Sequence, residues 1–191
     1  MSVEERGSQQ GGDAPCSPAD GGSIVAVRLS IALERLVLAR RVTEQFLADL
    51  TPAEWFWSPP QYPTHVAWQV MHIAASQYSL CFRRIRGVLP EDEAWFPAAY
   101  VAQFGLGSQP QLDPTANPSL DEIRRTFDGV YQRVLAEAPT YAESSLAETV
   151  DPPHPVFQTK LGSLEYASHH EGVHAGQIAM LRRLMHKKPL R

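Results

Sequence analysis

Cysteine is scarce in this sequence of 191 residues, which contains Cys16, Cys81 and no others. Because no C-x-x-C pair is present, we do not expect a disulfide framework. Apolar runs of 18 or more residues are also missing, so we expect no transmembrane helix and no membrane partner. The first fifteen residues, MSVEERGSQQGGDAP, lack the apolar stretch of a secretory signal, and this predicts a cytoplasmic protein.

An excess of positive charge is missing as well. The chain has 17 Lys and Arg residues against 21 Asp and Glu residues, a formal net charge of -4, and a pI of about 6.0. Proteins that bind nucleic acid usually carry a basic surface, so we expect no nucleic-acid partner. The length and the 43% of hydrophobic residues suit one globular domain with a core of its own.

The start of the chain differs in composition from the rest. Residues 1–22 are rich in Gly, Ser, Gln, Asp and Pro and contain few apolar side chains. Such a segment cannot bury enough apolar surface to offset the entropy that ordering costs. We therefore predict a disordered tail over residues 1–22 and a folded domain over residues 23–191.

Hydrophobic periodicity predicts four long helices. Apolar residues recur at helical spacing along four segments, which are residues 23–50, 64–86, 119–138 and 163–186. Long polar connections separate the second helix from the third and the third from the fourth, and the first of these connections has room for a short helix of its own. No segment shows a strong β pattern. The sequence therefore predicts an all-α fold, a four-helix bundle with long inter-helix connections.

The fourth predicted helix contains the stretch SHHEGVHAGQ, residues 168–177, and within it an H-E-x-x-H pattern at His170, Glu171 and His174. His170 and His174 are four residues apart, so on a helix their imidazoles lie on the same face, one turn apart. Both fall among apolar inner positions, where a polar ring is costly unless something satisfies it. A metal ion, a hydrogen-bond network or a wet cavity would each do so.

The same pattern occurs in zinc proteases, which usually take a third ligand from downstream of it. Residues 175–191 contain no Asp or Glu. His186 is twelve residues past His174, about 18 Å along a continuous helix, which is too far to share an ion. An H-E-x-x-H metallohydrolase is therefore a low-ranked alternative.

A third ligand is available upstream, on the second predicted helix. His72 lies there in a polar strip with Gln69, Ser76 and Ser79. Bundles commonly build metal sites from side chains on facing helices, and three histidines would leave one coordination position open, as in catalytic zinc sites. If the three share an ion, their ligand nitrogens must lie within about 4 Å of one another.

Two stretches, WQVMHIAAS at residues 68–76 and HHEGVHAGQIAMLRRL at residues 169–184, resemble the DinB/YfiT-like family of metalloenzymes. The loop AEWFWSPPQYPTHVAW also resembles that family, and the resemblance extends over residues 23–186. It implies a four-helix bundle that often forms homodimers. It also implies a divalent metal, mostly zinc or nickel, whose ligands by position are His72, His170 and His174. Histidine-only ligation also suits iron or copper.

The leading functional hypothesis is a divalent-metal-dependent enzyme that acts on a small molecule. The resemblance implies a thiol-dependent S-transferase or isomerase, which uses a low-molecular-weight thiol or water activated by the metal. One alternative is a non-catalytic metal-binding bundle with a role in stress responses. Another is a helical interaction module without metal, in which the three histidines do not converge.

Several other residues lie near the predicted ligands in the sequence. Glu171 is a candidate catalytic base, a supporting partner of the ligands, or a surface carboxylate. His169 and His186 point away from the ligand face and are predicted bystanders. For His65, at the start of the second helix, a surface position is favoured over a role in a pocket.

Overall fold

Four long helices form the framework of the protein. The computed structural model describes residues 23–190, and the tail predicted for residues 1–22 lies outside this range. The long helices are α1 (Ile24–Leu47), α3 (Val66–Tyr78), α6 (Leu120–Glu137) and α8 (Lys160–Leu184). A π-helical turn (Ser79–Arg83) and α4 (Arg84–Arg86) continue α3 as far as Gly87. Residues 23–190 contain no strand, which confirms the all-α class.

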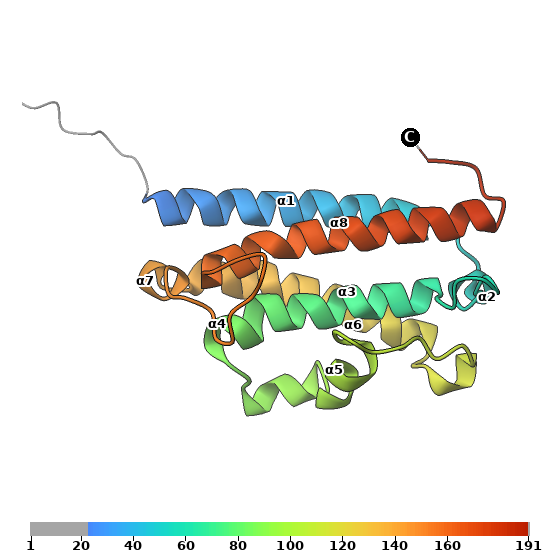
Figure 1. The fold of residues 1–191 in the computed structure, drawn as a ribbon, viewed down its shortest axis with the longest axis horizontal. Coiled ribbons are helices and arrows are strands. Elements are labelled where there is room, and N and C mark those ends of the chain that lie inside the picture. Colours follow the sequence, from blue (N-terminus) through green and yellow to red (C-terminus); the bar gives the residue numbers. More distant parts are fainter. Residues whose placement is uncertain (1–22, 191) are drawn as a thin grey trace, which may run out of the picture.

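The directions of the helices explain the first long connection. α1 and α8 run in one direction and α3 and α6 in the other (Figure 1). α8 packs against α1 and α3, and α3 packs against α6. Because α3 and α6 are parallel neighbours, the chain must return along the bundle before α6 can start. The returning segment contains α5 (Ala98–Phe104), which packs on α3, and 3₁₀ turns at Pro90–Ala94 and Pro114–Ala116.

The second long connection, between α6 and α8, ends earlier than predicted. It holds a 3₁₀ turn (Ala138–Thr140), α7 (Glu143–Leu146) and a single antiparallel bridge between Thr149 and Thr159. The Thr159 side chain accepts a hydrogen bond from the backbone N–H of Gly162 and so caps α8. The helix therefore begins at Lys160 rather than at Ser163. At the other end of the bundle, α2 (Pro52–Trp55) leads into α3.

The interior contains one buried cation that contacts all the other long helices. Arg40 of α1 is 2% exposed. Its Nε donates to Glu171 Oε1 of α8 at 3.0 Å, its Nη2 to Gln77 Oε1 of α3 at 3.3 Å, and its Nη1 to the carbonyl oxygen of Phe127 in α6 at 3.1 Å. The guanidinium carbon also lies 3.3 Å from the centre of the Phe127 ring. A single side chain therefore fixes the positions of four helices.

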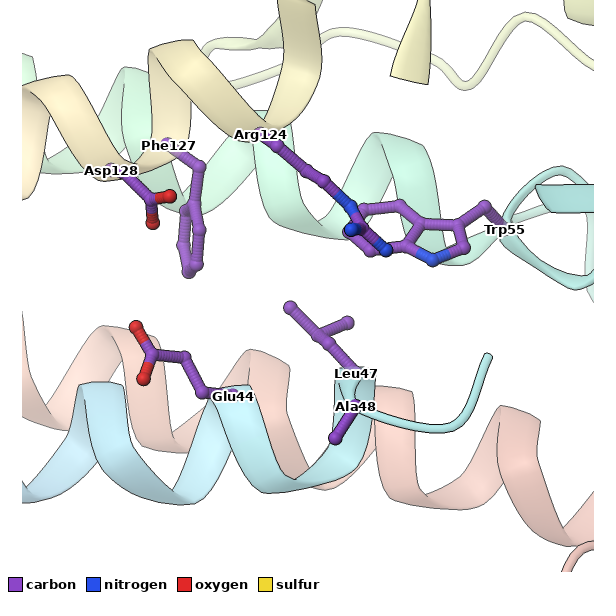
Figure 2. A pocket seen from close by; sticks show the side chains of 7 residues that line it. All are labelled: Glu44, Leu47, Ala48, Trp55, Arg124, Phe127 and Asp128. Carbon is purple, nitrogen blue, oxygen red and sulfur yellow. The ribbon is translucent and has the colours of Figure 1, made fainter. Parts of the chain in front are cut away.

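A cavity of about 210 Å³ lies between α1 and α6 beside this cation. Leu47 and Glu44 of α1 face Phe127, Asp128 and Arg124 of α6 across it, with Trp55 at one end (Figure 2). Asp128 also lies 3.6 Å from Arg40 Nη1, so the buried cation and this cavity share two residues of α6.

No helix within residues 23–190 combines the length and the apolar composition that crossing a membrane would require.

The Arg40 network predicts a large effect on stability. Arg40→Leu leaves the fully buried Glu171 without its counter-ion, and breaking a buried ion pair in this way typically costs about 3–5 kcal/mol. Arg28→Leu is the matched control, because Arg28 and Glu165 also form an ion pair between α1 and α8, but at the surface. That change should cost about 0–1 kcal/mol. Urea unfolding measures both, and similar losses for the two variants would contradict the role assigned to Arg40.

Candidate metal centre

The structure brings His72, His170 and His174 together between α3 and α8. One ligand nitrogen from each ring lies within 4.8 Å of the other two. The ring centres of His72 and His174 are 4.5 Å apart, as are those of His170 and His174, and those of His72 and His170 are 5.1 Å apart. Ligand atoms about 2.1 Å from one ion are at most about 4.2 Å apart. A shared ion would therefore require the three nitrogens to lie at about the spacing seen here or slightly closer.

Hydrogen bonds determine which ring nitrogen stays free in two of the three histidines. His72 Nδ1 donates to the carbonyl oxygen of Phe104 at 2.6 Å, and His174 Nδ1 donates to Gln69 Oε1 at 2.6 Å. Carbonyl and amide oxygens can only accept, so each Nδ1 carries a proton and each Nε2 has a free lone pair. Metal-ligating histidines usually have a partner of this kind on the other nitrogen.

The rings are also held in the neutral form that binds metal. Burial, and then the charge of the neighbouring rings, lowers the pKa of His170 to about 3. Burial and the charge of His72 lower the pKa of His174 to about 4. Burial likewise lowers the pKa of His72, against the opposing effect of its bond to Phe104. Three neutral imidazoles with a common focus are a donor set suited to zinc, nickel, copper or iron.

Glu171 faces a different part of the bundle. Its side chain is fully buried, so the alternative that made it a surface carboxylate is wrong. Oε1 accepts from Arg40, and Oε2 accepts from Gln77 Nε2 at 2.6 Å. Burial raises the pKa of this carboxyl, and the Arg40 guanidinium opposes the rise. Its role as a catalytic base stays a prediction, and its observed partners belong to the interior network.

Three further histidines assigned from the sequence lie at exposed or buried positions. His169 and His186 are exposed, as predicted for bystanders. His65 is fully buried, so its predicted surface position is wrong. Its Nδ1 accepts from the backbone N–H of Trp68 and caps α3, and its Nε2 donates to the carbonyl oxygen of Gln111 at 2.9 Å. His65 therefore attaches the connection before α6 to the start of α3.

Sequence reasoning did not assign the residues that support the ligands. Gln69 is the partner of His174, and the Trp68 ring stacks on His72 with ring centres 4.7 Å apart. Gln69 belongs to the polar strip noted around His72, and this strip was the signal that could have identified it. The Phe104 carbonyl comes from α5, and no pattern in the sequence places α5 against His72.

The lowered pKa values predict acid sensitivity of the metal-free protein. A histidine with a pKa of about 6.5 when unfolded and about 3 or 4 when folded binds more protons in the unfolded state between those values. The free energy of unfolding should therefore fall as the pH is lowered from 7 toward 4, by up to about 1.4 kcal/mol per pH unit for each ring. Urea unfolding at several pH values measures this slope. A His170→Gln and His174→Gln double variant should have a flatter slope, and an unchanged one would contradict the interpretation.

Comparison with known proteins places the chain in a family. Its sequence matches the DinB superfamily over residues 35–178. The crystal structure of a conserved protein from Enterococcus faecalis is similar, with a TM-score of 0.61 and 19% identity, over 81% of this chain and 95% of that one. No curated protein is significantly similar in sequence. The match covers all of α3 and α6, most of α8 and the second half of α1, including His72, His170 and His174, and the chain belongs to the DinB superfamily.

Proposed function

We propose that His72, His170 and His174 bind one divalent metal ion, and that the protein is a metal-dependent enzyme acting on a small molecule. The observation that carries this proposal is the convergence of three neutral imidazoles from two helices, two of them with Nε2 left free by bonds at Nδ1. Zinc or nickel are the ions we favour, and iron or copper also suit this ligation.

The size of the ligand set favours catalysis over a purely structural role. Within residues 23–190 the cluster consists of three histidines, without a fourth His, Cys, Asp or Glu. Structural zinc sites use four protein ligands, and catalytic sites keep one position open. An ion bound here would lower the pKa of a thiol or water that takes the open position.

The protein's own contribution is to hold the ligands in place. The Phe104 carbonyl and Gln69 fix the ring orientations of His72 and His174. The Trp68 ring covers one face of His72. The Arg40–Glu171 ion pair fixes α8 against α1 one residue from His170. Ligands positioned this way need little rearrangement when they bind an ion, which favours a defined geometry over a loose one.

The finer part of the proposal is the reaction. We propose thiol-dependent S-transfer or isomerisation, with a low-molecular-weight thiol as cosubstrate, on the strength of the resemblance to DinB/YfiT-like enzymes. Under the hypothesis of a helical interaction module without metal, the three histidines would not converge. Their convergence contradicts that hypothesis. The non-catalytic metal-binding bundle remains the alternative, because it would use the same three ligands.

Single substitutions test the ligand set. His72→Ala, His170→Ala and His174→Ala each remove one ligand, so each should weaken zinc binding by more than the roughly 100-fold that losing a supporting residue can cost. His169→Ala and His186→Ala are matched controls on the same chain and should bind zinc like the unaltered protein. Competition with a chromophoric chelator measures the affinities. Equal affinities for the ligand variants and the controls would contradict the site.

The reaction is tested on protein purified without a histidine tag. Elemental analysis should find about one divalent ion per chain, and this ion should be lost in His72→Ala. The loaded protein should then consume an electrophile in the presence of one member of a panel of low-molecular-weight thiols, and removal of the ion by a chelator should abolish turnover. A bound ion without turnover across the panel would favour the non-catalytic alternative.

A further inference from the structure

A cavity of about 660 Å³ lies at the end of the bundle where α3 begins and α8 ends. Pro59, Tyr62 and Pro63 border it from the loop before α3, Ser108 from the connection before α6, and Met180 and Leu184 from α8. Its volume falls in the range of sites that hold small organic ligands, about 300–1,000 Å³. Three of these residues are among the exposed large hydrophobic residues of the surface, namely Tyr62, Met180 and Leu184.

The lining of this cavity contains no charged side chain from residues 23–190. Its polar members are neutral amides and hydroxyls, such as Gln69 and Thr64, and the others are apolar. Burying an ionised group without a counter-charge costs far more than burying a neutral one. The lining therefore favours an uncharged, largely apolar ligand and disfavours a carboxylate or an ammonium group.

Two residues of the lining each carry a buried polar atom without a partner. Trp68 Nε1 and Ser108 Oγ are both withdrawn from solvent, and neither has a hydrogen bond to the part of the chain that the structure describes. A buried donor left unpaired costs about 1–3 kcal/mol, so native proteins usually satisfy such groups. The indole N–H can only donate. The matching ligand group is therefore an acceptor, such as a ketone, ether or epoxide oxygen.

The cavity adjoins the three histidines through two of its own residues. Trp68 lines the cavity and stacks on His72. Gln69 also lines it and accepts the hydrogen bond from His174. A ligand held here would thus lie one side chain away from two of the three candidate metal ligands.

We propose that this cavity binds an uncharged, largely apolar molecule through an oxygen acceptor that takes hydrogen bonds from Trp68 Nε1 and Ser108 Oγ. That this molecule is the substrate of the metal site rests on the proposed function. The binding itself does not, because it depends on the cavity lining alone. A neutral carbonyl or epoxide compound is the kind of electrophile that the lining fits.

Three naphthalene probes of similar size separate the contributions of apolar contact, of an oxygen acceptor and of charge to binding. 2-Acetylnaphthalene carries a neutral acceptor, 2-ethylnaphthalene carries none, and 2-naphthoate is charged. Binding to the full chain, with and without zinc, is measured by ligand-observed NMR. We expect the ketone to bind and the carboxylate to bind at least about tenfold more weakly. Trp68→Phe and Ser108→Ala should each weaken ketone binding about three- to tenfold and change hydrocarbon binding less than twofold.

Matched controls come from the same chain. Trp55 Nε1 and Ser58 Oγ are also buried without a partner in the described residues, and neither residue lines this cavity. Trp55→Phe and Ser58→Ala should therefore leave ketone binding unchanged. The proposal is overturned by any of three results: the unaltered protein binds neither neutral probe, it binds the carboxylate as tightly as the ketone, or the control variants weaken ketone binding as much as the cavity variants do.

The two proposals fail in different ways. If the metal-free protein binds the ketone as described but takes up no zinc, the cavity proposal holds and the proposed function fails. If zinc binds to the three histidines but no neutral probe binds with or without it, the cavity proposal fails and the metal site stands.

Discussion

The buried ion pair between Arg40 and Glu171 is the constraint on which the rest of the structure depends. Arg40 also donates to Gln77 and to the carbonyl oxygen of Phe127, so one guanidinium contacts α3, α6 and α8 from α1. A guanidinium buried this deeply is tolerated only when its partners are in place. The need to keep these partners in reach fixes both the spacing of the helices and the rotation of α8 about its axis. The cluster of His72, His170 and His174 inherits that rotation, because His170 is the residue directly before Glu171.

The H-E-x-x-H pattern therefore has two uses on two faces of one helix. Successive residues of a helix are about 100° apart, so Glu171 faces α1 and Arg40 while the two histidines face α3 and His72. In this chain the acidic residue of the pattern is part of the interior network, and the third histidine comes from upstream. Beside the three histidines, Trp68 contacts His72 and Gln69 contacts His174, and both residues also line the cavity of about 660 Å³.

Features of the fold and the candidate site that depend on residues close together in the sequence could be predicted, and those that depend on distant residues could not. Helical periodicity predicted the four long helices, and the second of them ends at Gly87, which has a φ of 85°, directly after the predicted range of 64–86. The polar strip around His72 predicted its place opposite the other two histidines. The partner of Glu171 could not be predicted, because Arg40 lies 131 residues earlier and resembles any charged residue of a helix. The burial of His65 was missed because it depends on Gln111, in a connection whose path no periodicity specifies.

The central claim is that the three histidines bind one ion through the nitrogens that their hydrogen bonds leave free. Anomalous diffraction from crystals of the full chain grown with zinc tests it most directly. The account predicts one site, with Nε2 of His72, Nε2 of His174 and a ring nitrogen of His170 each about 2.0–2.1 Å from the ion. An ion bound through Nδ1 of His72 or His174, an ion bound elsewhere, or no ion at all would contradict it.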